Sequence, residues 1–442
     1  MPFSSFGLHA NLLRGVKDLG FAQPTPIQKD AIPAGLAGRD VLACSATGSG
    51  KTAAFVLPIL QRLMVLPRGT TRTLILAPTR ELAAQLQEHI CELGQHTPIT
   101  SAAIYGGVGM GPQRQALERG VDIIVATPGR LLDHFQYRYA DMTGITMLVL
   151  DEADRMLDMG FLPDIRRILQ RLPQERQTYF FSATLPHEIV TLAHEMLDQP
   201  VAINLQRQSQ PASGITQNIY PVPHLRKSPL LLALVQSGSI RSALVFTRTK
   251  RRADRVAEYL KRNGIAAARI HGDRTQAQRT QAMEGFKRGR YQVLVATDVA
   301  ARGIDVDALS HVINYDMPGS TDDYIHRVGR TARAEATGDA FTFVTPEEEH
   351  DLRAIEQGLA RTLPRVVVPQ FDYTVAESDA RAAAARTSAH NGHRPSGGRQ
   401  GQRHSESGGN GERRSSRSGS SRAWEQPAWE SRHATRHAAS RA

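Results

Sequence analysis

Three acidic residues lie within four positions of one another in the segment VLDEADR, residues 149–155. Asp151, Glu152 and Asp154 directly follow two apolar residues. Carboxylates held so close together repel one another, so a buried cluster needs a cation or a proton beside it. The segment therefore predicts a site at which a bound cation or a proton balances this charge.

A glycine-rich segment, SATGSGKTAAF (residues 45–55), fits the pattern of a phosphate-binding loop. Its glycines let backbone N–H groups wrap phosphates, and the helix that follows presents its N-terminus to the anion. We expect Lys51 to neutralise the terminal phosphates and the Thr52 hydroxyl to coordinate Mg²⁺. Serine occupies the first position, where the pattern usually has Gly or Ala, and its small size should be tolerated. The predicted nucleotide-binding residues of the loop are Ser45, Ala46, Thr47, Gly48, Ser49, Gly50, Lys51 and Thr52.

The acidic cluster gains a role from this loop. In P-loop ATPases the first acid after a buried strand helps to hold Mg²⁺, so Asp151 and Thr52 are the predicted metal ligands. Glu152 is placed to orient or deprotonate the attacking water. Acids favoured by a helix macrodipole are the alternative, but that explanation does not account for their place after an apolar run. The predicted cofactors are therefore ATP and Mg²⁺.

Short apolar runs separated by helical patterns indicate an α/β fold with buried parallel strands. A polar segment rich in Gln and Ser divides the runs into two series. The predicted organisation is a first domain at residues 1–205, a linker at 206–216, a second domain at 217–370 and a tail at 371–442. The predicted strands are residues 41–44, 73–77, 99–104, 122–126, 147–150, 178–181, 243–246, 267–270, 292–296, 311–315 and 340–344.

Composition narrows the class of protein. The 442 residues are too many for one ordinary core and carry a formal net charge of +11, which favours polyanion partners such as nucleic acid. Solubility alone is the other explanation of this charge. Only Cys44 and Cys91 are present, which argues against a disulfide framework or a cysteine zinc site and fits a reducing compartment. No apolar run is long enough for a membrane helix and no signal peptide is evident, so we expect a cytoplasmic protein.

The segment after residue 373 is rich in Gly, Ser and Arg and is predicted to be disordered. It contains Trp424 and Trp429, so it could hold RNA through phosphate contacts and stacking. A tail that only increases solubility is the alternative. Ribosomal particles or RNA-decay proteins are the other partners predicted for it.

Taken together, the motifs resemble those of DEAD-box RNA helicases, and the chain is most similar to the bacterial RhlE-like subgroup. The resemblance runs from about residue 3 to about residue 369 and rests on the order and spacing of several short motifs. It implies two RecA-like parallel-sheet domains joined by a short linker, with ATP and RNA bound between them. The motifs are SATGSGKT (45–52), PTREL (78–82), TPGR (127–130), DEAD (151–154), SAT (182–184) and HRVGRTAR (326–333).

The resemblance implies further roles for single residues. GFAQPTPIQ (20–28) is similar to the Q motif, in which Phe21 would stack on adenine and Gln28 would read its edge. Asp305 would contact the ribose of ATP. Arg327, Arg330 and Arg333 follow one another at three-residue intervals, which a helix would place on one face. By the resemblance, Arg330 and Arg333 would act as arginine fingers, with His326 as a further catalytic candidate.

The resemblance also implies the residues that contact RNA and those that couple RNA binding to hydrolysis. Each RNA-binding candidate lies after a strand or at a helix start, where N–H groups and Arg can meet phosphates, although each alone could be an ordinary turn or cap. Asp154 would be coupled to Ser182 and Thr184 in a closed state. The RNA-binding candidates are Pro78, Thr79, Arg80, Gly106, Gly107, Thr127, Pro128, Gly129, Arg130, Gln276, Arg279 and Thr297.

The predicted function is an RNA-stimulated ATPase that locally unwinds short RNA duplexes or remodels RNA–protein complexes, including in ribosome assembly, by closing its two domains. RNA contacts to the backbone predict binding that is nearly independent of sequence. An ATP-gated RNA clamp or assembly platform with little unwinding is the alternative, because it would need the same residues. A DNA translocase is a second alternative, which the Q motif and the DEAD segment disfavour.

Overall fold

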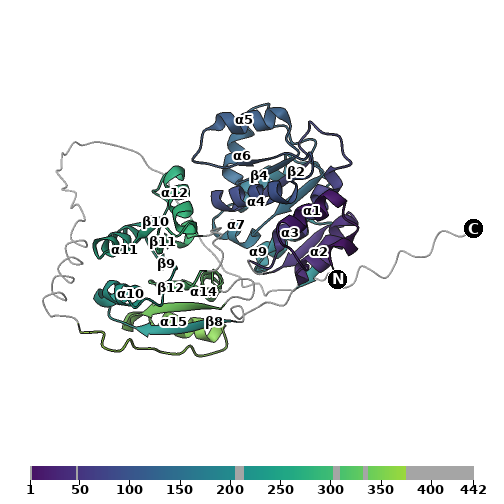
Figure 1. The fold of residues 1–442 in the computed structure, drawn as a ribbon. Helices are drawn as coiled ribbons and strands as arrows, with labels where there is room; N and C mark the ends of the chain where they lie inside the picture. The colour runs from purple at the N-terminus through teal and green to yellow at the C-terminus, as the bar shows by residue number, and fades with distance from the viewer. Residues whose placement is uncertain (1, 46–47, 205–213, 302–308, 332–336, 375–442) are drawn as a thin grey trace, which may run out of the picture. The chain divides into compact units, whose positions relative to one another are not determined.

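The computed structural model describes residues 2–45, 48–204, 214–301, 309–331 and 337–374 (Figure 1). Its strands form two separate parallel sheets with helices packed on both faces of each. The elements of the first domain are η1 (Phe3–Phe6), α1 (Ala10–Asp18), α2 (Pro26–Leu36), β1 (Val41–Cys44), α3 (Lys51–Leu63), β2 (Thr73–Leu76), α4 (Arg80–Leu93), β3 (Ser101–Ile104), α5 (Met110–Arg119), β4 (Ile123–Ala126), α6 (Pro128–His134), β5 (Met147–Leu150), α7 (Ala153–Asp158), α8 (Leu162–Leu169), β6 (Gln177–Ser182), α9 (His187–Met196) and β7 (Val201–Asn204).

The first sheet has the strand order β3-β4-β2-β5-β6-β1-β7. Alternate residues of each strand enter different cores, as β5 shows: Val149 packs with α1 to α4, whereas Leu148 and Leu150 pack with α5 to α9. Because both faces are covered, all four residues of β2, β4 and β5 are buried. This explains why the sequence shows continuous apolar runs here instead of an alternating pattern.

Parallel pairing gathers the motifs of the first domain at one edge of this sheet. The phosphate-binding loop follows β1, PTREL follows β2, and Gly106–Gly107 follow β3. TPGR, DEAD and SAT follow or end β4, β5 and β6 in the same way. All these strands run in one direction, so their carboxyl ends lie at a common edge, which is where parallel sheets bind ligands.

The second sheet has the strand order β10-β11-β9-β12-β13-β8 and is also parallel. Helices α10 and α11 pack on one face, and α12, α14 and α15 supply the cores on the other. The elements are β8 (Ile215–Pro221), η2 (His224–Arg226), α10 (Lys227–Gln236), β9 (Ala243–Thr247), α11 (Lys250–Arg262), β10 (Ala267–Ile270), α12 (Gln276–Lys287), β11 (Val293–Thr297), α13 (Asp298–Ala301), β12 (His311–Asn314), α14 (Thr321–Val328), β13 (Gly338–Val344), η3 (Pro346–Glu348) and α15 (Glu349–Gly358).

The predicted α/β fold with two RecA-like parallel-sheet domains is confirmed, with differences at the edges. Strands β7 and β8, which flank the polar segment, are not among the predicted strands. Strand β8 begins at Ile215, inside the predicted linker 206–216, because it pairs with β13 along seven residues. At the other end, Phe371 and Tyr373 pack against the core of the second domain, so the predicted start of the tail at residue 371 is too early.

The rest of the predicted tail and most of the predicted linker lie outside the described residues. Cys44 is buried and Cys91 exposed, and the two are not joined, as expected. Across the helices that the structure describes, none has the length and apolar character needed to cross a membrane.

Candidate nucleotide and RNA site

The phosphate-binding loop is tied to its neighbours by hydrogen bonds. Lys51 is 6% exposed, and its Nζ donates to the backbone oxygen of Ser45 at 3.2 Å. The side-chain oxygens of Ser45 and Ser49 lie 2.9 Å apart. The chain turns into α3 at Gly50, whose φ of 90° is a conformation that side chains other than glycine's rarely adopt. The loop thus holds the lysine at the N-terminus of α3, where an anion is favoured.

Gln28 links the predicted Q motif to this loop. Its Nε2 donates to the Gly50 carbonyl at 3.0 Å, and its Oε1 accepts from the Thr25 backbone N–H at 2.9 Å, which completes a capping box at the start of α2. After these two contacts the Gln28 amide has one N–H hydrogen and one oxygen lone pair left for a ligand. Recognition of adenine by Gln28 stays a prediction. Phe21 is 40% exposed and stacks on the buried ring of Phe3, which leaves part of its surface for a ligand.

Asp151 fits the role of a cation ligand. Its carboxylate is buried, and Oδ1 has no hydrogen-bond partner among the described residues. Burial raises the pKa of Asp151 to about 6, although the Lys51 ammonium opposes the shift. A buried carboxylate oxygen without a partner is costly, and a hard cation such as Mg²⁺ is the partner that oxygen ligands suit. Thr52 lies at the start of α3 beside Lys51 and could supply the second ligand.

Glu152 is held by Arg155, a residue for which the sequence predicted no role. Arg155 Nη1 donates to Glu152 Oε2 at 3.0 Å, and both side chains are buried, at 4% and 7% exposure. Burial opposes ionisation, but the positive charges of Arg155 and Lys51 outweigh it and lower the pKa of Glu152 to about 2. Glu152 is therefore a fixed, ionised carboxylate beside Asp151. The three-residue spacing within α7 is the signal that could have found Arg155.

Asp154 contacts the SAT segment as expected. Its Oδ2 accepts from the backbone N–H groups of Ala183 and Thr184, at 3.1 and 2.8 Å, and from the Thr184 hydroxyl at 3.0 Å. The Asp154 backbone N–H donates to Ser182 Oγ at 3.2 Å. With three donors on one oxygen, Asp154 joins the ends of β5 and β6. This arrangement suits a linking acid better than a metal ligand.

The RNA-binding candidates of the first domain lie around the starts of α4 and α6. Thr79 caps α4 by accepting from the Leu82 N–H, and Thr127 and Pro128 begin α6. Arg130 Nη1 donates to the backbone oxygen of Val108 at 3.0 Å, which connects TPGR to the loop of Gly106 and Gly107. Each of these motifs lies after a strand or at a helix start, and their role in RNA binding stays a prediction. The candidates on this edge are Pro78, Thr79, Arg80, Gly106, Gly107, Thr127, Pro128, Gly129 and Arg130.

In the second domain, Gln276 and Arg279 lie on the first turn of α12, and Thr297 ends β11. Both α12 side chains contact Glu81, the acid of PTREL: Gln276 Nε2 donates to its Oε1 at 3.1 Å, and Arg279 Nη2 lies 2.9 Å from its Oε2. Glu81 is a second residue, after Arg155, for which the sequence predicted no role. It balances the charge of an arginine that is predicted to bind phosphate.

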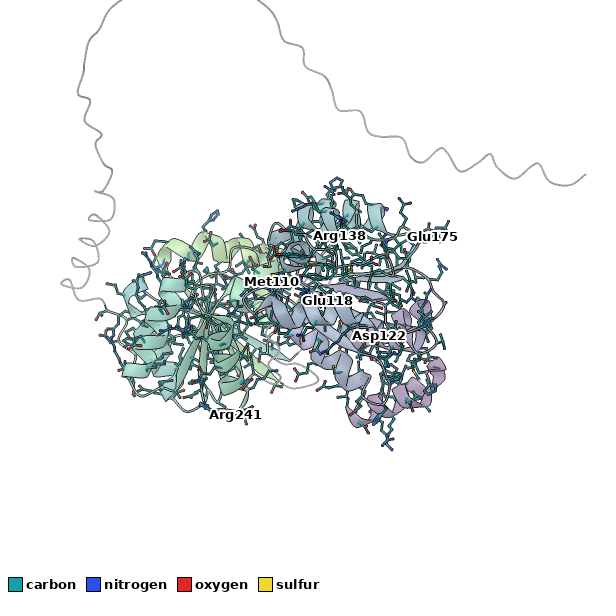
Figure 2. All side chains as sticks on the ribbon, turned by 90° about the horizontal axis from the view of Figure 1, so that it is seen from above. Met110, Glu118, Asp122, Arg138, Glu175 and Arg241 are labelled. Carbon is teal, nitrogen blue, oxygen red and sulfur yellow. The ribbon has the colours of Figure 1, made fainter. Side chains whose placement is uncertain are left out.

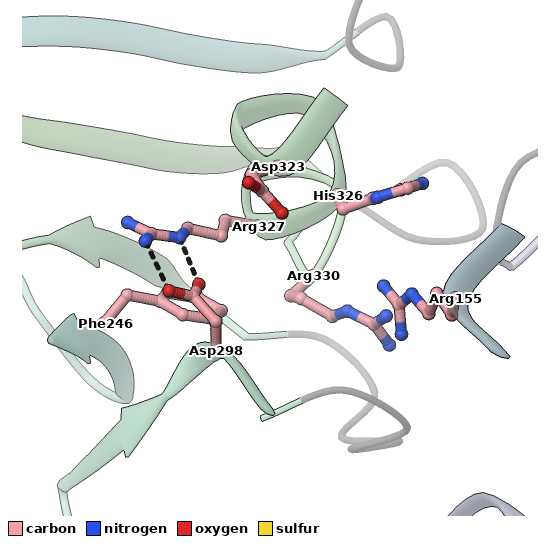
Figure 3. A pocket seen from close by; sticks show the side chains of 7 residues that line it. All are labelled: Arg155, Phe246, Asp298, Asp323, His326, Arg327 and Arg330. Carbon is pink, nitrogen blue, oxygen red and sulfur yellow. Dashed lines mark hydrogen bonds and ion pairs between the residues drawn. The ribbon is translucent and has the colours of Figure 1, made fainter. Parts of the chain in front are cut away.

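The expectation that a helix places three arginines on one face is wrong. Helix α14 ends at Val328, because Gly329 caps it, and Arg330 lies in the turn that follows. Arg327 is buried and pairs with Asp298 through two hydrogen bonds of 2.6 and 2.8 Å, drawn in Figure 3. Arg327 therefore holds α14 to the end of β11, and it is not free to bind a phosphate.

Arg330 and His326 line a small pocket with Arg155 (Figure 3). The guanidinium groups of Arg330 and Arg155 point toward one another there. Burial and the charge of Arg155 lower the pKa of His326 to about 4, which keeps this imidazole neutral near pH 7. Asp298 and Asp323 also line this pocket, so side chains of both charges face it. The predicted residues Ala46, Thr47, Asp305 and Arg333 lie outside the described residues.

Comparisons with known proteins show which families the chain matches. The DEAD/DEAH box helicase family matches residues 25–192, and the helicase conserved C-terminal domain matches residues 226–335. The chain is 43% identical over 373 residues to the DEAD-box ATP-dependent RNA helicase CshA of Bacillus subtilis, covering 84% of this chain and 75% of the relative. It is 41% identical over 370 residues to the ATP-dependent RNA helicase CshA of Listeria monocytogenes, covering 84% and 71%.

Solved structures show the same fold. S. cerevisiae Dbp5 bound to RNA and ADP BeF3 is similar with a TM-score of 0.77 and 32% identity, over 87% of this chain and 99% of that one. The DEAD-box helicase Mss116 bound to ssRNA and UDP-BeF is similar with a TM-score of 0.75 and 26% identity, over 83% and 80%. The similarity thus extends over both sheets.

Proposed function

Because the chain belongs to the DEAD-box family of ATP-dependent RNA helicases, we propose that it hydrolyses ATP in response to RNA and separates short RNA duplexes by drawing its two domains together. The predicted cofactors, ATP and Mg²⁺, are those of the family. The RhlE-like assignment stays a prediction. The observation that carries the mechanism is the pair of contacts at VLDEADR: Glu152 is held ionised by Arg155, and Asp154 is joined to SAT.

Each residue of the site has a distinct task in this mechanism. Lys51 and the N-terminus of α3 bind the phosphates, and bound Mg²⁺, held by Thr52 and Asp151, would offset their negative charge. Glu152 orients the attacking water and accepts its proton. Arg330 approaches from the second domain as an arginine finger, an effect worth roughly 10³–10⁵ in rate in enzymes that use one. Arg333 shares this role by the family resemblance.

RNA that contacts motifs of both domains favours the arrangement in which these groups act together. The supporting contact is Glu81, which lies beside Arg80 and bonds to Gln276 and Arg279 of α12. A motif of each domain is thus already in hydrogen-bond distance of the other. RNA bound across this pair would connect RNA affinity to ATP hydrolysis.

The substitution Glu152→Gln tests the proposal. It keeps the shape of the side chain but removes the base, so we expect RNA-stimulated turnover to fall by about 100-fold or more, with little change in ATP binding. ATPase rates are measured with and without single-stranded RNA. Glu175→Gln, at an exposed position outside every motif, is the matched control and should behave as the unsubstituted protein. Full RNA-stimulated turnover in Glu152→Gln would refute the assigned role.

Strand displacement decides between unwinding and clamping. A labelled short RNA duplex should separate when ATP is added to the unsubstituted protein, and it should stay paired with Glu152→Gln. A duplex that stays paired while the protein remains bound to RNA after hydrolysis would support the clamp. Stimulation by DNA as strong as that by RNA would instead favour a DNA translocase. Recruitment of ribosomal particles or RNA-decay proteins by the tail, a role in ribosome assembly and a cytoplasmic location stay predictions.

A further inference from the structure

A chain of hydrogen bonds connects α6 to the loop that carries Gly106 and Gly107. The Tyr139 hydroxyl lies 3.0 Å from His134 Nδ1, and His134 Nε2 lies 3.1 Å from Gln113 Oε1. Gln113 Nε2 donates to the backbone oxygen of Tyr105 at 2.9 Å, directly before the two glycines. His134 is fully buried and Gln113 is 5% exposed. Water therefore cannot easily replace a lost partner in this chain.

The direction of each hydrogen bond follows from one end. The Tyr105 carbonyl can only accept, so the Gln113 amide must present its nitrogen to it and its oxygen to His134. His134 Nε2 must then carry a hydrogen and donate to that oxygen. In the neutral ring Nδ1 is left as an acceptor, which the Tyr139 hydroxyl satisfies. Burial, together with the charge of Arg130, lowers the pKa of His134, in agreement with a neutral ring.

The same helix reaches the loop a second time. Arg130, four residues before His134 on α6, donates to the backbone oxygen of Val108, directly after the glycines. Residues one turn apart on a helix share a face, so α6 presents both groups to one segment. The loop is held at Tyr105 through Gln113 and His134, and at Val108 through Arg130. Gln113 lies on α5, the helix that carries the labelled residues Met110 and Glu118 in Figure 2.

We propose that Gln113 and His134, supported by Tyr139, are positioning residues. They fix the Gly106–Gly107 loop relative to the TPGR segment, so that both segments can contact the RNA backbone at the same time. The inference rests on the proposed function, because it assumes that these two segments contact RNA. In this proposal the three side chains need not contact RNA themselves. They act by fixing the backbone carbonyl before the glycines, and hence the direction in which the N–H groups of the loop point.

The substitution Gln113→Leu tests the inference. Leucine fills a similar volume but can neither donate to Tyr105 nor accept from His134. We expect the RNA concentration for half-maximal ATPase stimulation to rise about fivefold or more, which is the loss of about one buried hydrogen bond. The KM for ATP and the unstimulated rate should stay within about twofold, since the phosphate-binding loop follows a different strand. A substitution that only destabilised the fold would not change RNA half-saturation while leaving the KM for ATP unchanged.

A matched control lies two residues away on the same helix. Gln115 is exposed, so Gln115→Leu introduces the same chemical change without breaking the chain and should leave RNA half-saturation unchanged. An equal RNA half-saturation in Gln113→Leu and Gln115→Leu would overturn the inference. Tyr139→Phe removes only one hydroxyl and provides a milder variant should Gln113→Leu fail to fold. It should raise RNA half-saturation by a smaller factor, and no rise in it would also count against the inference.

Two further variants separate the inference from the function on which it rests. His134→Gln restores a donor and an acceptor, so it should bind RNA more tightly than His134→Leu; equal weakening in both would overturn the inference. Arg130→Ala probes the RNA-binding segment directly. If Arg130→Ala leaves RNA half-saturation unchanged, the RNA role of this edge fails, and the inference fails with it. If Arg130→Ala weakens RNA binding and Gln113→Leu does not, only the inference fails.

Discussion

Glu152 occupies a backbone conformation that residues other than glycine seldom adopt. Its φ of 55° and ψ of 53° lie in the left-handed region, which costs about 1–3 kcal/mol in a non-glycine residue. This conformation turns the chain from β5 into α7, with only Asp151 and Glu152 between the two elements. Asp151 directly follows the strand, Glu152 lies at the turn and Asp154 lies on the helix. Three neighbouring acids thereby acquire three different sets of partners.

The Arg155–Glu152 pair yields a prediction about stability. Arg155→Met leaves a buried carboxylate with less compensation, so we expect the free energy of unfolding to fall by about 3 kcal/mol. Arg167→Met is the matched control, because Arg167 and Asp164 form an exposed pair with the same three-residue spacing, which is worth at most about 1 kcal/mol. Urea denaturation measures both. Adding Glu152→Gln to Arg155→Met should recover part of the loss, and no recovery would contradict the electrostatic explanation.

At the scale of elements, close contact between helices depends on residues without a side chain. Gly15 of α1 faces the end of α4, where a Cβ atom would lie 2.4 Å from the backbone oxygen of Leu93. Backbone cannot move aside as a flexible side chain can. Gly111 of α5 offers a contrast, since nothing lies within 4 Å of the Cβ position. The same residue type therefore serves packing in one helix and has no packing role in the other.

Gly15→Ala should therefore destabilise the first domain, by about 1–3 kcal/mol as overpacking does, because α1 must shift away from α4. Gly111→Ala should be neutral or raise stability by up to about 1 kcal/mol, since alanine favours a helix and meets no neighbour. Thermal unfolding of the two variants gives the comparison. Equal unfolding temperatures would show that α1 does not pack against α4 as described.

For the whole molecule, buried histidines predict that acid destabilises the fold. Burial lowers the pKa values of His134 and His311, and that of His326 to about 4. In the unfolded chain these rings take up protons near pH 6.5. Because the unfolded state then binds more protons than the folded state, stability falls as the pH drops below about 6.5. Asp151, whose pKa of about 6 is raised, has the opposite effect but is a single group.

We expect a lower urea midpoint at pH 5.5 than at pH 7.5. His311→Asn should reduce this difference, because His311 is buried beside Phe341 and Asp339 and Asn does not titrate. A control at an exposed ring, His350→Asn, should leave the difference unchanged. A midpoint that rises on acidification would mean that the raised pKa of Asp151, and not the buried histidines, dominates the pH dependence.

The sequence by itself determined the local features of this protein. The runs that became β1 and β5 were predicted with the bounds that the structure shows, because strands covered on both faces leave an uninterrupted apolar signal. Lys51 was predicted from the glycine-rich loop that contains it, and Asp151 from its place directly after an apolar run, since both are chemical patterns within a few residues. These inferences needed only neighbours along the chain.

Only the tertiary structure decided which distant side chains meet. Nothing in the sequence pairs Arg327 with Asp298, twenty-nine residues away. Arg327 is buried by this pairing and therefore does not form part of the basic helix face that was expected. Likewise, β8 exists because β13 supplies its hydrogen bonds, and a short polar-flanked run gave no sign of this partner. The chain from Tyr139 through His134 and Gln113 depends on the orientation of two helices. Periodicity identifies the buried face of a helix, but hydrogen bonds require distances near 3 Å that only the packed fold sets.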